Sequence, residues 1–541
     1  MKHTTHKLTN YETMYLEKIN ISKKIIGLIG RPVNSTAVSA MLETLGYHEK
    51  DMIYKYGYKN IFEFSEAIYY ICLELSDSKK EKDNTQTKKR LDRKYKKTSK
   101  YFYGIIYIIP VLGQIVALFS LRYSLWISLD FNEMQATVVV FGTILSFIVT
   151  GGFIQVFSKE GIFQVSHENF YEINDSATLI YTIASIFTLL IGLIVYFTNM
   201  IFNFFDPKMI IISLLYYVSL SFLWLHIAIL FNMKHYLTGI ILPLLGIIPV
   251  HLIMIHTHWG IYTAHLIGLL STNILALCYC YFILKSVRKH KYSNFQIDTS
   301  PFLELKYCIY KNFKYFLSGL AFYIFFCTDR LISWSVHNSA TNPYFFWFKT
   351  EYELGLVWAF LPLLVIISFL ESLIQGFSAL ISKAQKIFIF KEIEEHNRFF
   401  MIYYVKHLCL IVILGLAFII FFYLLFEKLK QVEYIIEIQD FFKSPITYFT
   451  FYIASISYLL LAIGLYNGLI FFTLARPQFV INALIPAIVI NILTGLFFSR
   501  WISYEYGIIG LAFGAITYAF LSTKNAWSLL KKIDYYYYAG F

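Results

Sequence analysis

Charged residues are scarce in this sequence. Asp, Glu, Lys and Arg make up 15% of its 541 residues, against about 25% in a typical soluble domain. Hydrophobic residues account for 57% and aromatic residues for 19%. A chain of this length could hold several soluble domains. The composition argues against them and favours one large body inside a membrane.

Cysteine is rare as well, and recognisable catalytic motifs are missing. Cys278 and Cys280 share an apolar run with no second pair nearby, so we interpret them as small buried hydrophobic residues. No Ser-His-Asp, HExxH or Walker pattern occurs in a suitable context. We therefore predict that the chain is not an enzyme, with no catalytic residue, no metal and no cofactor. Any transport would be driven by an ion gradient, by polymer synthesis or by diffusion.

The first hundred residues differ from the rest. Residues 1–76 contain no run long enough to span a bilayer, and residues 61–75 carry apolar side chains at helical spacing. This pattern predicts a small soluble cytoplasmic domain with an amphipathic helix. Residues 77–100 are polar and strongly basic, which predicts a disordered linker near anionic lipid headgroups.

Apolar segments follow, each near the roughly 20 residues that a helix needs to cross a bilayer. They predict an all-α polytopic membrane protein with about twelve transmembrane helices. The fifth segment contains Pro243 and Pro249, so we expect it to be kinked. The segments occupy residues 101–121, 134–158, 176–203, 209–232, 236–256, 260–284, 313–336, 355–381, 403–426, 447–473, 478–500 and 507–530.

Lys and Arg are unevenly distributed between the loops. They are dense before the first segment, after the sixth, after the eighth and in the tail, and sparse on the opposite side. This asymmetry predicts that both termini are cytoplasmic. We therefore attribute the net charge of +12 to the orientation of the chain in the membrane. We expect lipids as partners and no nucleic acid.

The long basic loop after the sixth segment divides the membrane body. It covers residues 285–312 and separates a first six-helix lobe, 101–284, from a second lobe with a short tail, 313–541. Two lobes around a central path are the layout of an exporter.

Ionisable side chains inside a membrane are costly and are therefore candidates for function. Asp329 and Arg330 are adjacent in the seventh segment, so they cannot face each other and each is expected to pair across helices. They form either a structural ion pair or part of a substrate path. Glu351 and Glu353 precede the eighth segment, where carboxylates also suit a helix N-terminus. Glu371 lies deeper in that segment, where we favour a functional role.

Histidines gather in the first lobe. His251, His256 and His258 have a spacing that fits no known zinc motif well, so we interpret them as interface residues. His226 and His265 are the candidates for the intramembrane base of an acyltransferase, and the sequence offers neither a convincing partner.

The second lobe resembles a known family. Its strings FLSGLAFYIFFCTDRLISWS and FKTEYELGLVWAFLPLLVIISFLE are similar to the Pel exopolysaccharide exporter (PelG) family, within the multidrug/oligosaccharidyl-lipid/polysaccharide (MOP) flippase superfamily. An acidic-basic dipeptide, a following Trp, a Tyr-acidic pair and a helix Pro carry the resemblance. Here these elements are Asp329, Arg330, Trp334, Tyr352, Glu353 and Pro362. The resemblance covers about residues 100–541 and leaves residues 1–100 unexplained.

The resemblance implies an exporter that moves a polysaccharide or lipid-linked sugar out across the cytoplasmic membrane. It implies a cytosolic glycosyltransferase and other membrane subunits of a synthase complex as partners. The family handles a polymer rich in amino sugars, so we expect a negatively charged path. The path residues would be Asp329, Arg330, Glu351, Glu353 and Glu371, with Trp334, Tyr352 and Trp358 as aromatic lining or interface.

Other functions stay open. One alternative is a cation-coupled drug or lipid flippase of the same superfamily. A second is a membrane-embedded acyltransferase, and a third is a membrane scaffold with no transported substrate.

Overall fold

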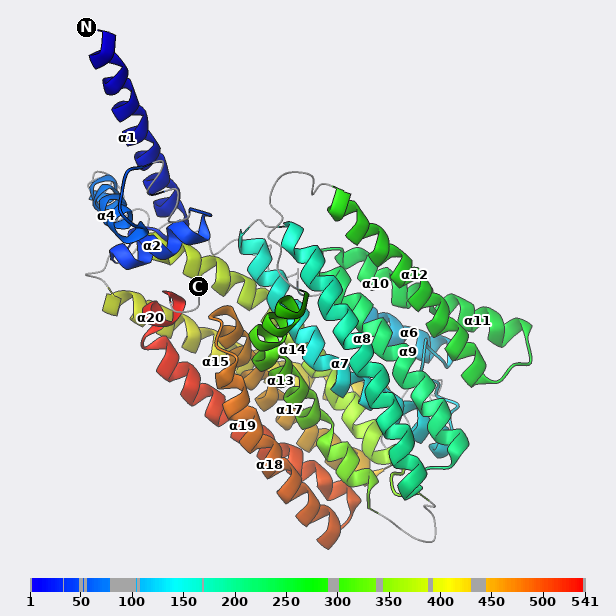
Figure 1. The fold of residues 1–541 in the computed structure, drawn as a ribbon. Coiled ribbons are helices and arrows are strands. Elements are labelled where there is room, and N and C mark those ends of the chain that lie inside the picture. Colours follow the sequence, from blue (N-terminus) through cyan, green and yellow to red (C-terminus); the bar gives the residue numbers. More distant parts are fainter. Residues whose placement is uncertain are drawn as a thin grey trace. The chain divides into compact units, whose positions relative to one another are not determined.

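The computed structural model describes residues 2–32, 34–47, 52, 56–77, 104, 108–167, 170–289, 301–336, 344–387, 393–429 and 444–538. Within these ranges the regular elements are helices and no strand occurs (Figure 1). The chain forms two compact units. The first comprises Met1–Tyr101, Ser372–Val405 and Leu529–Ala539, and the second comprises Phe102–Glu371, Lys406–Ser528 and Gly540–Phe541.

The N-terminal helices of the first unit enclose a hydrophobic core of their own. α1 (Lys2–Ile29), α2 (Ser35–Thr44) and α4 (Ile61–Asp77) bury one face each, and α4 confirms the amphipathic helix expected over 61–75. α2 begins where Asn34 Oδ1 accepts a hydrogen bond from Ala37 N at 2.8 Å. The core includes Ile21, Ile25, Val38, Leu42, Phe64 and Ile68.

The remaining helices are mostly long and apolar. They are α6 (Ile109–Leu121), α7 (Glu133–His167), α8 (Phe170–Phe202), α9 (Pro207–Asn232), α10 (Tyr236–Leu245), α11 (Ile247–His256), α12 (Ile261–Lys289), α13 (Pro301–Trp334), α14 (Thr350–Ile387), α15 (Ile393–Leu429), α17 (Pro445–Thr473), α18 (Gln478–Trp501), α19 (Ile508–Leu530) and the short α20 (Ile533–Tyr538).

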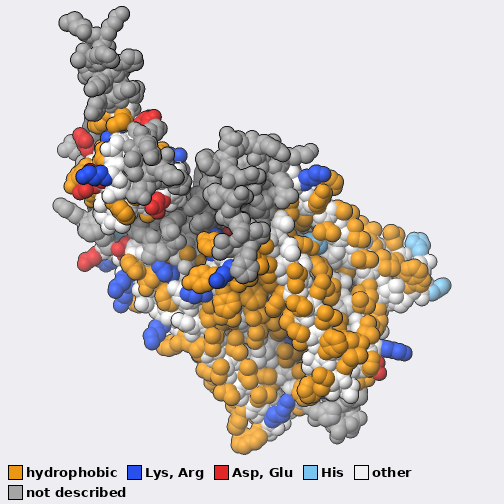
Figure 2. All heavy atoms as spheres, viewed as in Figure 1, with side chains coloured by type: hydrophobic (Ala, Val, Ile, Leu, Met, Phe, Trp, Pro, Cys, Tyr) orange, Lys and Arg blue, Asp and Glu red, His pale blue; other side chains and the backbone are white. Residues whose placement is uncertain are grey.

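Eleven helical spans in the described residues are long and apolar enough to cross a membrane. They agree with the predicted segments from 134–158 onward. The first predicted segment, 101–121, is represented by α6, a shorter apolar helix, and most of residues 101–107 lie outside the described residues. On the face drawn in Figure 2, hydrophobic side chains cover most of the described surface of the helix bundle. The chain is a multi-pass α-helical membrane protein.

The kink expected in the fifth span is a break. α10 ends at Leu245 and α11 starts at Ile247, with Gly246 between Pro243 and Pro249. A Cβ on Gly246 would lie 2.1 Å from Thr272 Oγ1, so this position needs glycine for close approach to α12.

The structure corrects the expectation of a long loop over 285–312. α12 continues to Lys289 and α13 already begins at Pro301. Lys and Arg mark where a segment leaves the membrane and do not themselves end a helix. Proline in the first turn is compatible with a helix start because its missing N–H has no intrahelical partner there.

Candidate functional site

A buried polar network joins α13 to the first turns of α14. Asp329 is 1% exposed, and its Oδ2 accepts a hydrogen bond of 2.8 Å from the hydroxyl of Tyr352, which is fully buried. Asp329 Oδ1 has no hydrogen-bond partner within the described residues. An unpaired oxygen in such a place is costly when the carboxylate is ionised.

Arg330 and Glu353 form the ionic part of the same network. Arg330 Nε lies 3.3 Å from Glu353 Oε2, and the indole Nε1 of Trp334 donates to Glu353 Oε1 at 2.9 Å. The expected pairing of Arg330 across helices is therefore confirmed, with Glu353 as its partner. Asp329 instead pairs with a tyrosine hydroxyl. The network thus holds two carboxylates against one guanidinium.

Three other predicted site residues, two of the path and one of the aromatic lining, lie outside this network. Glu351 is exposed and accepts a hydrogen bond of 3.3 Å from the hydroxyl of Tyr504. Trp358 packs edge-on against Phe426, with ring centroids 4.5 Å apart. Glu371 is half-buried and lies about 27 Å further along α14 than Glu353, at 1.5 Å per residue.

The two lobes meet along α7 and α13. A Cβ on Gly319 of α13 would lie 2.4 Å from the carbonyl oxygen of Gly151 of α7, so the two backbones touch there. Towards the C-terminal end of α7, the buried Glu160 contacts Lys159 Nζ and Lys311 Nζ, the latter at 3.3 Å from α13. We call this set the α7 C-terminal contact.

The N-terminal end of α7 is also joined to the second lobe. Glu133 Oε2 accepts a hydrogen bond of 2.8 Å from the indole of Trp347, and Thr137 Oγ1 accepts one of 3.0 Å from the backbone N–H of Phe348. We call this set the α7 N-terminal contact. Sequence reasoning missed both contacts, although the adjacent Lys159 and Glu160 at the end of an apolar segment were a visible signal for the first.

The two buried histidines of the first lobe, His226 and His265, are hydrogen-bonded to tyrosine hydroxyls. Asn273 Nδ2 donates to two backbone carbonyls, so its Oδ1 is the acceptor for His226 Nδ1 at 3.2 Å. His226 Nε2 then accepts from the hydroxyl of Tyr181 at 2.9 Å. With both ring nitrogens occupied, His226 has none left for a substrate. Buried His265 contacts Tyr216 through Nδ1 at 3.0 Å.

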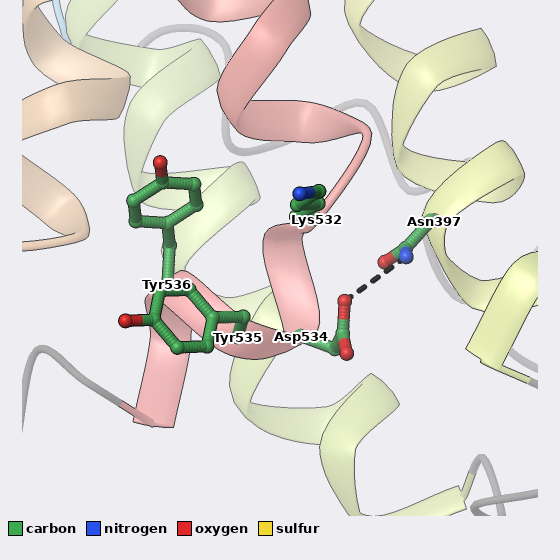
Figure 3. A pocket seen from close by; sticks show the side chains of 5 residues that line it. All are labelled: Asn397, Lys532, Asp534, Tyr535 and Tyr536. Carbon is green, nitrogen blue, oxygen red and sulfur yellow. Dashed lines mark hydrogen bonds between the residues drawn. The ribbon is translucent and has the colours of Figure 1, made fainter.

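A cavity of about 390 Å³ lies in the first unit and is shown in Figure 3. In it Asn397 Nδ2 donates to Asp534 Oδ1 at 3.0 Å, which ties α15 to α20. None of the predicted path residues lines it. Within the described part of the chain, no group of three or more His, Cys, Asp or Glu is placed to hold a metal ion. The cavity is lined by Asn397, Lys532, Asp534, Tyr535 and Tyr536.

Solved structures of transporters have the same helix arrangement. A mutant MATE protein matches with a TM-score of 0.52 at 15% identity, over 79% of this chain and 95% of that chain. A MOP superfamily transporter from Pyrococcus furiosus matches with 0.52 at 14% identity, over 79% and 95%. The chain has the MOP transporter fold. An outward-facing multidrug resistance MATE family transporter of this superfamily also matches, with 0.51 at 15% identity over 79% and 95%.

Comparisons of the sequence itself assign no family to the chain. No protein-family model matches the chain, and no curated protein matches it. The MOP-like fold expected from the sequence is therefore confirmed, and the finer resemblance to the Pel exporters stays a prediction.

Proposed function

We propose that this chain is a membrane transporter whose two lobes separate first on one side and then on the other. One observation carries the proposal: α7 is joined to the second lobe near both ends through polar contacts that can break. Glu160 with Lys311 forms one of them, and Glu133 with Trp347 forms the other. A scaffold has no need of two releasable contacts on one helix.

The proposed substrate is a polysaccharide or a lipid-linked sugar, exported across the cytoplasmic membrane. Support comes from the resemblance of residues 316–335 and 348–371 to the Pel exporters. It implies a cytosolic glycosyltransferase and further membrane subunits as partners, with both termini in the cytoplasm. The residues proposed for the path are Asp329, Arg330, Glu351, Glu353 and Glu371, with Trp334, Tyr352 and Trp358 beside them.

A second candidate is a cation-coupled drug or lipid flippase. It is favoured by the buried network, which holds two carboxylates and one guanidinium and in which Asp329 Oδ1 lacks a hydrogen bond from any described residue. Uptake of a proton or a cation there would relieve the excess negative charge. Transport would then depend on a gradient of that ion.

Reconstitution into liposomes separates the two candidates. The purified full chain is expected to move a fluorescent lipid-linked oligosaccharide between leaflets, with protein-free liposomes as control. Ethidium uptake driven by a pH or sodium gradient, without movement of the sugar probe, would overturn the sugar assignment and favour the second candidate.

A further inference from the structure

Aromatic side chains from both lobes form a continuous set of ring contacts. They come from α7 and α9 of the first lobe and from α13, α14 and α17 of the second. We call them the ring series. Its members are Trp224, Phe147, Tyr323, Phe322, Phe326, Phe360 and Tyr458.

The ring series crosses the boundary between the lobes at one stacked pair. Phe147 of α7 lies parallel to Tyr323 of α13, with ring centroids 5.8 Å apart and planes inclined by 3°. On its other side Phe147 stacks on Trp224 at 5.1 Å. Each of these rings covers a face of its neighbour, so separation of the lobes would uncover the facing sides of Phe147 and Tyr323.

The series continues along one face of α13. Phe322, Phe326 and Arg330 are spaced by four residues and lie on the same side of the helix. Phe322 stacks on Phe326 at 6.3 Å, and Phe326 stacks on Tyr458 at 5.6 Å. The guanidinium of Arg330 lies over the ring of Phe326, 5.4 Å from its centroid.

This face of α13 lies deep among the helices and still keeps some accessible surface. Tyr323 and Arg330 are both surrounded by protein, and both keep accessible surface. Phe325 and Asp329, on the same stretch of α13, are by contrast 0% and 1% exposed. A side chain that is deep and still accessible borders an internal space rather than lipid.

Three polar groups along the ring series have hydrogen-bonding capacity to spare. The hydroxyls of Tyr323 and Tyr458 make no hydrogen bond with any described residue, and neither do the terminal nitrogens of Arg330. A flat apolar ligand would stack on the rings but leave these groups unpaired. A pyranose ring satisfies both needs, because its C–H face packs on an aromatic face and its hydroxyls project from the rim.

Arg330 is the charged group beside the rings that keeps the most accessible surface. The side chain of Arg330 is 14% exposed, whereas its partner Glu353 is 7% exposed and Asp329 is almost fully covered. A ligand next to Phe326 would therefore meet the guanidinium of Arg330 before either carboxylate.

We propose that the ring series, with Tyr323, Tyr458 and Arg330, is a binding site for pyranose units of a neutral or acidic glycan. Sugar rings stack on Phe147, Tyr323 and Phe326 when the lobes separate, and their hydroxyl or carboxylate groups bind Arg330. This inference rests on the proposed transport of a sugar and adds the site and the charge class of its substrate.

Calorimetric titration of the purified full chain tests the site. The probes are an N-acetylglucosamine oligosaccharide, an oligogalacturonate, a chitosan oligosaccharide and tetraphenylphosphonium. The neutral and acidic sugars are expected to bind more tightly than the two cations. Tighter binding of either cation would overturn the proposal.

Ring variants locate the binding. Phe326→Leu and Tyr323→Leu should weaken sugar binding about fivefold or more, because each removes a stacking face. Phe326→Tyr keeps the ring and should bind as the unmodified chain does. Tyr323→Phe should have a smaller effect than Tyr323→Leu. Phe325→Leu is the matched control on the covered side of α13, and thermal unfolding of every variant checks its folding.

The outcomes distinguish the site from the transport function. If liposomes containing the protein move the lipid-linked sugar while Phe326→Leu binds glycan as tightly as the unmodified chain, the site is wrong and the function stands. If the unmodified chain neither binds nor moves any glycan probe, the proposed substrate class fails and the site fails with it.

Discussion

Removing Arg330 alone should cost more than removing Arg330 and Glu353 together. The two side chains are 14% and 7% exposed, and their closest atoms are 3.3 Å apart. Removing one partner of a buried pair leaves an uncompensated charge, at a cost of about 3–5 kcal/mol. Replacing both partners leaves one buried carboxylate, Asp329, without a counter-charge, whereas losing Arg330 alone leaves two.

The two single variants should not be equivalent. Arg330→Gln leaves Glu353 and Asp329 without a counter-charge, so its cost should approach the upper end of that range. Glu353→Gln leaves Arg330 with Asp329 beside it, and a glutamine oxygen can still accept the hydrogen bond from Trp334. We expect about 1–3 kcal/mol for this change, and the double variant should be more stable than Arg330→Gln.

Unfolding of the detergent-solubilised chain with increasing SDS measures these differences. Glu351→Gln is the matched control, because Glu351 lies in the same helical turn but is exposed, and it should change stability by less than about 1 kcal/mol. If Arg330→Gln were as stable as the unmodified chain, or less harmful than the double variant, the network would be solvated and the reasoning would be refuted.

Four further expectations can be checked independently. Reporter fusions at residue 90 and at the C-terminus should both report cytoplasm, and an external signal at either contradicts the orientation. Deleting residues 1–95 should leave a membrane-inserted protein, since the N-terminal core is built from its own residues; loss of insertion counts against this. Glu371→Gln should reduce export at normal protein level and Glu371→Asp should be milder, whereas normal export would leave Glu371 a structural role. Glu160→Gln should speed maleimide labelling of a cysteine placed at the buried Ser318 in a chain lacking its native cysteines, with Glu133→Gln as control; unchanged labelling means that the contact does not hold the lobes together.

The sequence predicted the helices well because each needs only a long apolar run. The spans over 209–232 and 478–500 agree closely with α9 and α18. Pro243 and Pro249 led us to expect a kink in the fifth span, and the structure has a break at Gly246 between them. The start of α13 and both ends of α14 were placed too far inside, because charged residues outside the membrane do not stop a helix.

The site was predicted only in part, because a sequence does not show which side chains meet across two helices. Sequence shows that Asp329 and Arg330 are charged and adjacent, which excludes their facing each other. It cannot show which residue of another helix is the partner, and Glu353 was interpreted mainly as a helix-capping residue. The burial of Glu353 decides this point. Glu353 is only 5% exposed, so its carboxylate needs a positively charged partner in addition to the favourable dipole of the α14 N-terminus.

The ring series was invisible in the sequence because aromatic residues occur throughout it. Phe325 and Phe326 are neighbours with the same side chain, yet one is covered and the other borders accessible space. They differ because successive side chains of a helix point in different directions, and the orientation of α13 among its neighbours covers one direction and not the other. Helical spacing of Phe322, Phe326 and Arg330 was the available signal, but the same spacing is typical of any packed helix face.

The contacts of α7 suggest how such a site would be uncovered. The α7 C-terminal and N-terminal contacts lie near opposite ends of the helix, and Gly151 touches Gly319 between them. If one contact opens while the other holds, the lobes turn about this close glycine approach. Phe147 and Tyr323, stacked across the lobes near the same level, would then part towards the opened side. Opening the other contact would expose them to the opposite side, so one pair of rings could receive and release a sugar without a second site.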